Sequence, residues 1–141
     1  MDRRTGSGLP ALVLIVQDTA DARTLYDEYL EFCGFRVRTA ADGIQGMQAA
    51  QSERPDIILV DLPLPLTDGW EAIRRLRADA RTAAIPIVAV STYLTGDEPA
   101  RAREAGADVC LTKPCVPSQV ARAIRALLVY NTALRSTGAG A

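Results

Sequence analysis

The fold is decided by one stretch of the chain, which reads Ile57-Ile58-Leu59-Val60-Asp61-Leu62-Pro63-Leu64-Pro65-Leu66-Thr67-Asp68-Gly69. The apolar residues at its start favour a strand buried in a sheet, because Ile and Val suit a pleated, covered surface. Asp61 stands where that strand must end, since the prolines after it cannot donate to a sheet ladder. Open α/β sheets place their chemistry in the crevice at such strand ends. The stretch therefore predicts a functional carboxylate at Asp61.

Apolar runs on either side of this stretch indicate four more strands, at residues 11–16, 35–39, 85–90 and 108–112. Apolar residues at three- and four-residue spacing predict helices over about 22–33, 44–52 and 97–105, and from residues 69 and 117 onward. Within them, we expect Leu25, Cys33, Ile44 and Met47 to face the core. Strands that alternate with helices are typical of a parallel sheet covered on both faces. We therefore predict a doubly wound α/β fold with five parallel strands and five helices.

The length of 141 residues predicts a single domain with a real core. We expect this domain to occupy residues 10–130. Residues 1–9 combine glycine, serine and charge, which favours a disordered leader, and residues 131–141 are rich in small residues, which favours a flexible tail.

The composition excludes several classes of function. A net charge of −1 gives no bulk attraction to nucleic acid or to a membrane surface. No apolar run approaches the roughly 18 residues of a membrane span, and no cleavage site follows an apolar segment, so we expect a cytoplasmic protein. The absence of histidine excludes a phosphohistidine carrier and a histidine-based triad. Three cysteines at irregular spacing argue against a disulfide framework.

Polar side chains follow four of the predicted buried strands. They are Asp18, Asp61, Ser91 and Lys113. Because the carboxyl ends of parallel strands share one edge of a sheet, we expect these residues to converge. Two carboxylates suit a hard cation such as Mg²⁺, and a lysine with a hydroxyl suits phosphoryl oxygens. An aspartate can itself be the nucleophile that forms an aspartyl-phosphate. The sequence therefore predicts phosphoryl chemistry at this edge.

Over about residues 10–130 the chain resembles the receiver domain of a two-component response regulator. The segments that carry the resemblance are residues 13–18, 61–69, 88–91 and 106–114, in this order and at the family's spacing. The resemblance implies a flavodoxin-like fold with sheet order 2-1-3-4-5. It also implies a cis peptide bond before Pro114, which is a modest cost for an X–Pro bond.

The resemblance further implies a role for each residue. Asp61 would accept a phosphoryl group from the phosphohistidine of a partner histidine kinase or phosphotransfer protein. Asp18 and Asp61 would bind Mg²⁺, with the backbone carbonyl of Pro63 as a further ligand. Ser91 would hydrogen-bond the phosphoryl group, and Lys113 would form an ion pair with it. The chain would be no enzyme beyond catalysing its own phosphotransfer and dephosphorylation.

The chain departs from the family pattern at four positions. Gln17 replaces the first of two adjacent acids, so we expect weaker Mg²⁺ binding, with Gln17 acting through a water. Pro63 replaces a residue that is often polar, and Thr92 replaces a smaller one. Cys110 replaces the usual Tyr or Phe that swings inward on activation, so we expect any switch to rely more on the Ser91–Tyr93 loop and the helix after it.

Two hypotheses about function follow. In the first, the chain is a phosphorylatable receiver that signals by protein–protein interaction, through a downstream protein or by self-association through its last two helices. In the second, it is a degenerate receiver that acts as a phosphorylation-independent interaction module. A flavodoxin-like cofactor binder is disfavoured, because no glycine-rich phosphate loop follows the first strand.

Overall fold

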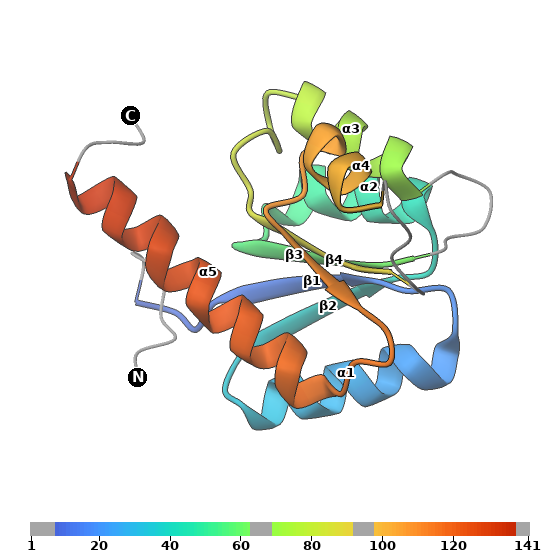
Figure 1. Ribbon diagram of the computed structural model, residues 1–141. Helices are drawn as coiled ribbons and strands as arrows, with labels where there is room; N and C mark the ends of the chain where they lie inside the picture. The colour runs from blue at the N-terminus through green and yellow to red at the C-terminus, as the bar shows by residue number, and fades with distance from the viewer. Residues whose placement is uncertain (1–7, 63–68, 92–97, 138–141) are drawn as a thin grey trace.

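A computed structural model gives the fold and describes residues 8–62, 69–91 and 98–137 (Figure 1). Strands and helices alternate along the chain as β1 (Leu12–Val16), α1 (Ala20–Phe32), β2 (Arg36–Ala40), α2 (Gly43–Glu53), β3 (Ile57–Asp61), α3 (Gly69–Ala78), β4 (Ile87–Ser91), α4 (Glu98–Ala105), β5 (Val109–Thr112) and α5 (Pro117–Thr137). The five strands are parallel and lie in the order β2-β1-β3-β4-β5. This confirms the predicted fold class and sheet order.

The sheet is covered on both faces, with α1 and α5 on one side and α2, α3 and α4 on the other (Figure 1). Strands β1, β3 and β4 are buried along their whole length, as their continuous apolar sequences require. Strand β2 lies at an edge and is largely exposed. This agrees with its alternating sequence.

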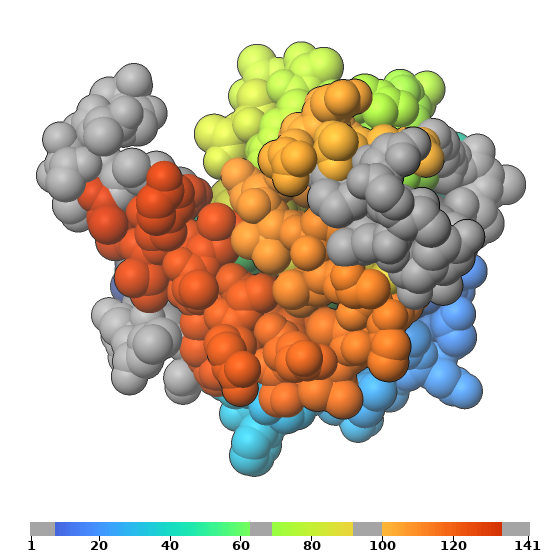
Figure 2. Space-filling model, viewed as in Figure 1, coloured from blue at the N-terminus to red at the C-terminus, as the bar shows by residue number. Residues whose placement is uncertain are grey.

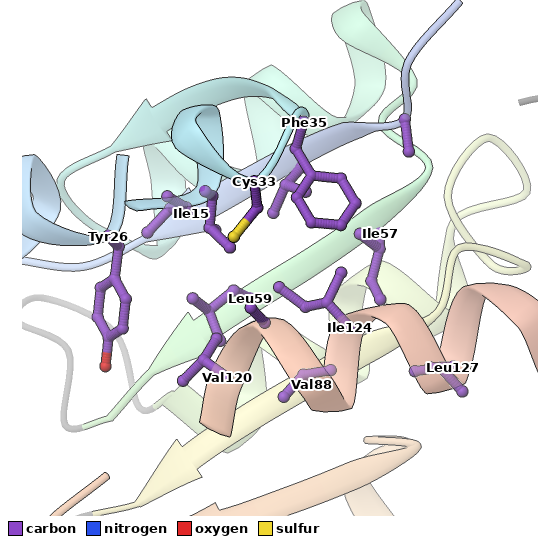
Figure 3. Close-up of a cluster of buried hydrophobic side chains, with 14 of the residues drawn as sticks. Ile15, Tyr26, Cys33, Phe35, Ile57, Leu59, Val88, Val120, Ile124 and Leu127 are labelled. Atoms are coloured by element: carbon purple, nitrogen blue, oxygen red, sulfur yellow. The ribbon is translucent and has the colours of Figure 1, made fainter. Parts of the chain in front are cut away.

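Side chains alternate between the two faces of each strand, so the core has two halves. Beneath α1 and α5, Ile15, Leu59 and Val88 pack with Ile124, and Cys33 is buried beside them as predicted (Figure 3). On the other face, the alternate residues of each strand pack against α2, α3 and α4. This half includes Leu14, Ile58, Ala89, Trp70 and Ile73. Burial of both halves fixes the register of the strands and thereby the alignment of their carboxyl ends.

Two helical side chains that we expected in the core are half exposed. Leu25 is 55% exposed and Ile44 is 50% exposed. In α1 the buried stripe runs through Tyr26 instead. In α2 a glycine faces the sheet, and a Cβ on Gly46 would lie only 2.9 Å from Cγ2 of Val16. The helix approaches β1 too closely for a large side chain, so Ile44 is turned toward solvent.

Helix α5 continues to Thr137, past the boundary that we expected at residue 130. The described part of the predicted flexible tail is therefore helical. The reason is local, because the first glycine after Pro117 is Gly138, and the intervening segment contains alanine and leucine, which are strong helix formers.

Candidate functional site

The polar residues predicted at the strand ends meet at the carboxyl edge of the sheet. Asp61 ends β3 and Ser91 ends β4, while Gln17 and Asp18 directly follow β1 and Lys113 follows β5. The side chains of Gln17, Asp61 and Ser91 are buried, Asp18 is exposed, and Lys113 is partly exposed. The buried Asp61 carboxylate therefore lies near an exposed carboxylate, that of Asp18, and a partly exposed ammonium group, that of Lys113.

An ion pair joins the two ends of β3 and β5. The Lys113 Nζ lies 2.5 Å from Oδ1 of Asp61, whose residue is only 3% exposed. The same ammonium donates a hydrogen bond to the backbone carbonyl of Leu62 at 3.0 Å. The main chain that follows β3 thus holds the lysine over the carboxylate, where a cation stabilises added negative charge.

Gln17 holds the other oxygen of the same carboxylate. Its Nε2 donates a hydrogen bond to Oδ2 of Asp61. Its Oε1 accepts a hydrogen bond of 2.8 Å from the backbone N–H of Thr19. The Arg23 guanidinium donates to the backbone carbonyls of Gln17 at 2.8 Å and of Asp18 at 3.1 Å, which fixes the turn after β1.

Burial raises the pKa of Asp61, because the charged form loses solvation in the sheet. The hydrogen bond and charge of Lys113, and the hydrogen bond of Gln17, lower this pKa, and the nearby charge of Asp18 adds to the rise. A carboxylate can act as a nucleophile toward phosphorus, and the burial of Asp61 leaves little water to displace from it.

Tyr26 is a neighbour of the site that the sequence did not reveal. Its side chain is 7% exposed, and Figure 3 shows its hydroxyl beside the carboxyl end of β3. Burial raises the pKa of Tyr26, and the charge of Asp61 raises it further. The helical spacing assigned Tyr26 to the core, which is correct for the ring. Spacing carries no information on how far a phenol oxygen reaches.

The remaining predicted positions are placed as follows. Pro63 and Thr92 lie outside the described residues. The peptide bond between Lys113 and Pro114 is cis, as the resemblance implied. Cys110 is partly buried and packs against the half of the core that contains Trp70. The thiol is therefore part of the packing on this face of the sheet.

Comparisons with known proteins agree with this geometry. The model of the response regulator receiver domain family matches residues 13–125. The transcriptional regulator RpaA of Synechocystis is 37% identical over 116 residues, which are 82% of this chain and 48% of RpaA. PilH of Pseudomonas aeruginosa is 34% identical over 84% of this chain and 98% of PilH. The chain thus spans about half the length of the first relative and nearly the whole of the second.

A solved structure shows the same fold with a metal in place. The receiver domain of the sensor histidine kinase PA1611 of Pseudomonas aeruginosa, described with a magnesium ion coordinated in its active-site cleft, has a TM-score of 0.76 and 33% identity over 84% of this chain and 97% of that one. The chain belongs to the receiver domain family of two-component response regulators. Within the part of the chain that the structure describes, no helix is long and apolar enough to cross a membrane.

Proposed function

We propose that the chain is a phosphorylatable receiver whose acceptor is Asp61. The observation that carries this proposal is the buried Asp61 carboxylate, with Lys113 at 2.5 Å on one oxygen and the strand-end residues of β1 and β4 around it. The family resemblance supports the same assignment.

In the proposed reaction, an Asp61 oxygen attacks the phosphorus of a phosphohistidine on a partner kinase or phosphotransfer protein. The phosphorus–nitrogen bond breaks, and its electron pair goes to the imidazole. Lys113 then stabilises the added negative charge as an ion pair, and the Ser91 hydroxyl donates to a phosphoryl oxygen. Hydrolysis by water later restores the Asp61 carboxylate and releases inorganic phosphate. These self-directed steps are the only catalysis that we assign to the chain.

The two carboxylates of the site fit Mg²⁺. The cation commonly takes one or two protein carboxylates and keeps several waters, which matches Asp18 and Asp61. The backbone carbonyl of Pro63 would be a third ligand, and it lies outside the described residues. Gln17 faces Asp61 with its nitrogen and Thr19 with its oxygen, so we do not include it among the direct ligands. When bound, the cation would reduce the repulsion between the carboxylate and an incoming phosphoryl group.

Signal output is proposed to occur through protein contacts in the cytoplasm. Helices α4 and α5 share one broad face of the molecule (Figure 2). Arg101 and Arg103 on α4 and Arg122 on α5 are exposed and would offer positive charge to a partner. The face that α4 and α5 share is the one through which a downstream protein, or a second copy of the chain, would bind. We assign no nucleic-acid or membrane partner.

The test is addition of beryllofluoride with Mg²⁺ while the fluorescence of Trp70 is recorded. Trp70 is buried in the same apolar cluster as Leu62, which follows the acceptor, so an adduct at Asp61 should alter its emission. The response should disappear in Asp61→Asn and persist in Asp21→Asn, which removes an exposed carboxylate from the first turn of α1.

The second candidate is the degenerate receiver, and the observation that favours it is the Gln17 amide at the acceptor oxygen. If millimolar Mg²⁺ and beryllofluoride produce no change in fluorescence and no adduct by intact mass, the phosphorylation-independent module is the better description.

A further inference from the structure

The orientation of the Gln17 amide is fixed by its two neighbours. The backbone N–H of Thr19 can only donate a hydrogen bond, and a carboxylate such as that of Asp61 can only accept one. The amide oxygen must therefore face Thr19 and the amide nitrogen must face Asp61, as the structure has them. A flipped amide would set two donors against each other and two oxygens against each other.

This orientation is protected by burial. Gln17 is only 4% exposed, so water cannot replace a lost partner at low cost. The backbone carbonyl of the same residue is held by Arg23, which limits movement of the main chain. Gln17 is consequently a fixed hydrogen-bond donor to Asp61, and its oxygen is directed to the Thr19 N–H instead of to Asp61.

We propose that Gln17 is a positioning residue that holds Oδ2 of Asp61 by its hydrogen bond and competes with a divalent cation for that oxygen. We call this hydrogen bond the latch. The inference rests on the proposed function for the role of Asp61 and concerns the regulation of that same site.

The competition follows from how the two oxygens of Asp61 are occupied. Oδ1 faces the Lys113 ammonium, whose charge would repel a cation, so Oδ2 is the oxygen that a cation would approach. An N–H group and a cation both place positive charge against Oδ2 and repel each other there. An acid in place of Gln17 would have the opposite effect, because a second carboxylate attracts the cation and repels Asp61 when the cation is absent.

The latch is tested first on the unaltered protein by NMR titration with MgCl₂, without any phosphoryl donor. The Gln17 side-chain NH₂ resonances should move in step with the backbone resonances of the site, because the cation displaces the amide from Oδ2. Gln17 resonances that stay in place while the backbone resonances around Asp61 saturate would overturn the proposal.

Two variants separate a latch from a ligand. Gln17→Ala removes the donor without adding charge, so its Mg²⁺ affinity should rise roughly tenfold, the scale of one charge-assisted hydrogen bond that no longer competes. Gln17→Glu adds a ligand charge as well and should bind at least about tenfold more tightly. Gln48→Glu makes the same charge change on the exposed surface of α2 and should leave the affinity unchanged.

A Gln17→Ala variant that binds Mg²⁺ no more tightly than the unaltered protein shows that Gln17 does not compete with the cation, and the latch is then wrong. This outcome differs from failure of the proposed function. If beryllofluoride forms an adduct at Asp61 but Gln17→Ala shows no gain in Mg²⁺ affinity, only the latch is rejected. The expected gain in Mg²⁺ affinity without any adduct rejects the acceptor role alone.

Discussion

Asp61 at the end of β3 and Asp108 directly before β5 both pair with a basic side chain, yet their surroundings differ. The Asp61 side chain is 3% exposed and meets Lys113 across the sheet edge. The Asp108 side chain is 40% exposed, meets Arg77 at 2.6 Å and also accepts a hydrogen bond of 2.8 Å from the backbone N–H of Ile87. One acid is desolvated at the carboxyl end of the sheet, and the other is hydrated and well bonded at the amino end.

Other polar contacts at the amino end of the sheet are also well bonded. Arg77 also donates to the backbone carbonyls of Gly106, Ala83 and Ile85, which ties the end of α3 to the turns before β4 and β5. Polar groups at this end stabilise the fold, because their charges keep access to water or to several partners. At the carboxyl end the Asp61 carboxylate is kept under burial, an environment that is common at functional sites.

The strongest test of this contrast is Arg77→Ala. The substitution removes hydrogen bonds to three carbonyls and to Asp108, and several of these groups are partly buried. We expect the free energy of unfolding to fall by about 2–4 kcal/mol, measured by urea denaturation. Beryllofluoride binding by the folded fraction should be unchanged. A variant that keeps its stability but loses the adduct would reverse the roles that we assign to the two ends.

Gly106→Ala should produce the next largest effect. Gly106 has a φ of +112°, a conformation that L side chains rarely adopt, and a Cβ there would lie 2.5 Å from Cγ of Arg77. We expect a loss of about 1–3 kcal/mol in the free energy of unfolding. In the Arg77→Ala background the loss should be smaller, because the steric part is gone. A double-mutant cycle measures that coupling, and strictly additive losses would contradict it.

The sequence predicted the site to the extent that the site depends on backbone direction. Residues such as Asp61 and Ser91 follow apolar runs, and parallel strands bring their ends to one edge. Contacts that depend on two partners at once were not predictable. The direction of the Gln17 amide requires both the Thr19 N–H and the Asp61 carboxylate, which only the folded chain brings together. The exposure of Ile44 likewise depends on how closely α2 approaches β1.

Two Asp→Asn variants should differ in their effect on stability, because only Asp108→Asn should lower it. At neutral pH, Asp61→Asn removes a charge whose burial raises its pKa, so we expect the free energy of unfolding to stay level or rise by about 1 kcal/mol. Lys113 keeps its bond to the Leu62 carbonyl. Asp108→Asn weakens a well-bonded pair and should lower the same quantity by about 1 kcal/mol. Urea denaturation of both variants decides this, and a loss in Asp61→Asn as large as in Asp108→Asn would remove the contrast.

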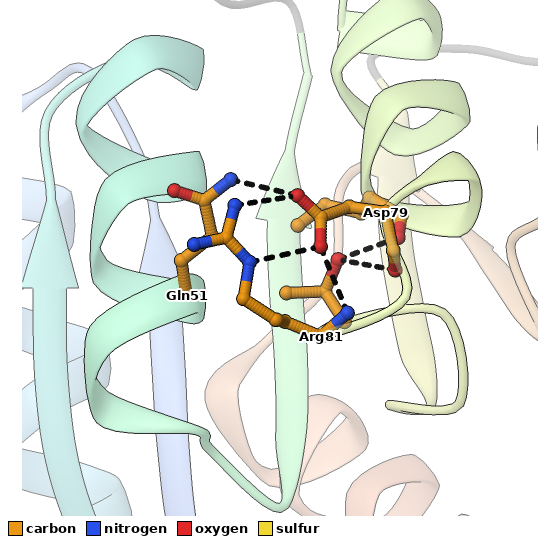
Figure 4. Close-up of polar contacts among 5 residues, drawn as sticks. Gln51, Asp79 and Arg81 are labelled. Carbon is orange, nitrogen blue, oxygen red and sulfur yellow. Dashed lines mark hydrogen bonds and ion pairs between the residues drawn. The ribbon is translucent and has the colours of Figure 1, made fainter.

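The smallest effect is expected at Asp79, which belongs with the amino end. Arg81 donates to Asp79 from its side chain and backbone, and Gln51 donates from α2 (Figure 4). These bonds, chiefly those of Arg81, lower the pKa of Asp79 from 3.8 to about 2. A lowered pKa means that the carboxylate stabilises the fold above its ordinary pKa and loses this contribution as the pH falls toward 2.

Arg81→Gln should therefore have a lower urea midpoint than the unaltered chain at pH 5, and the difference between the two midpoints should shrink steadily down to pH 2.5. Arg103→Gln, on the exposed surface of α4, should show no such pH dependence. A gap for Arg81→Gln that is constant with pH would mean that Arg81 acts by packing rather than through the charge of Asp79.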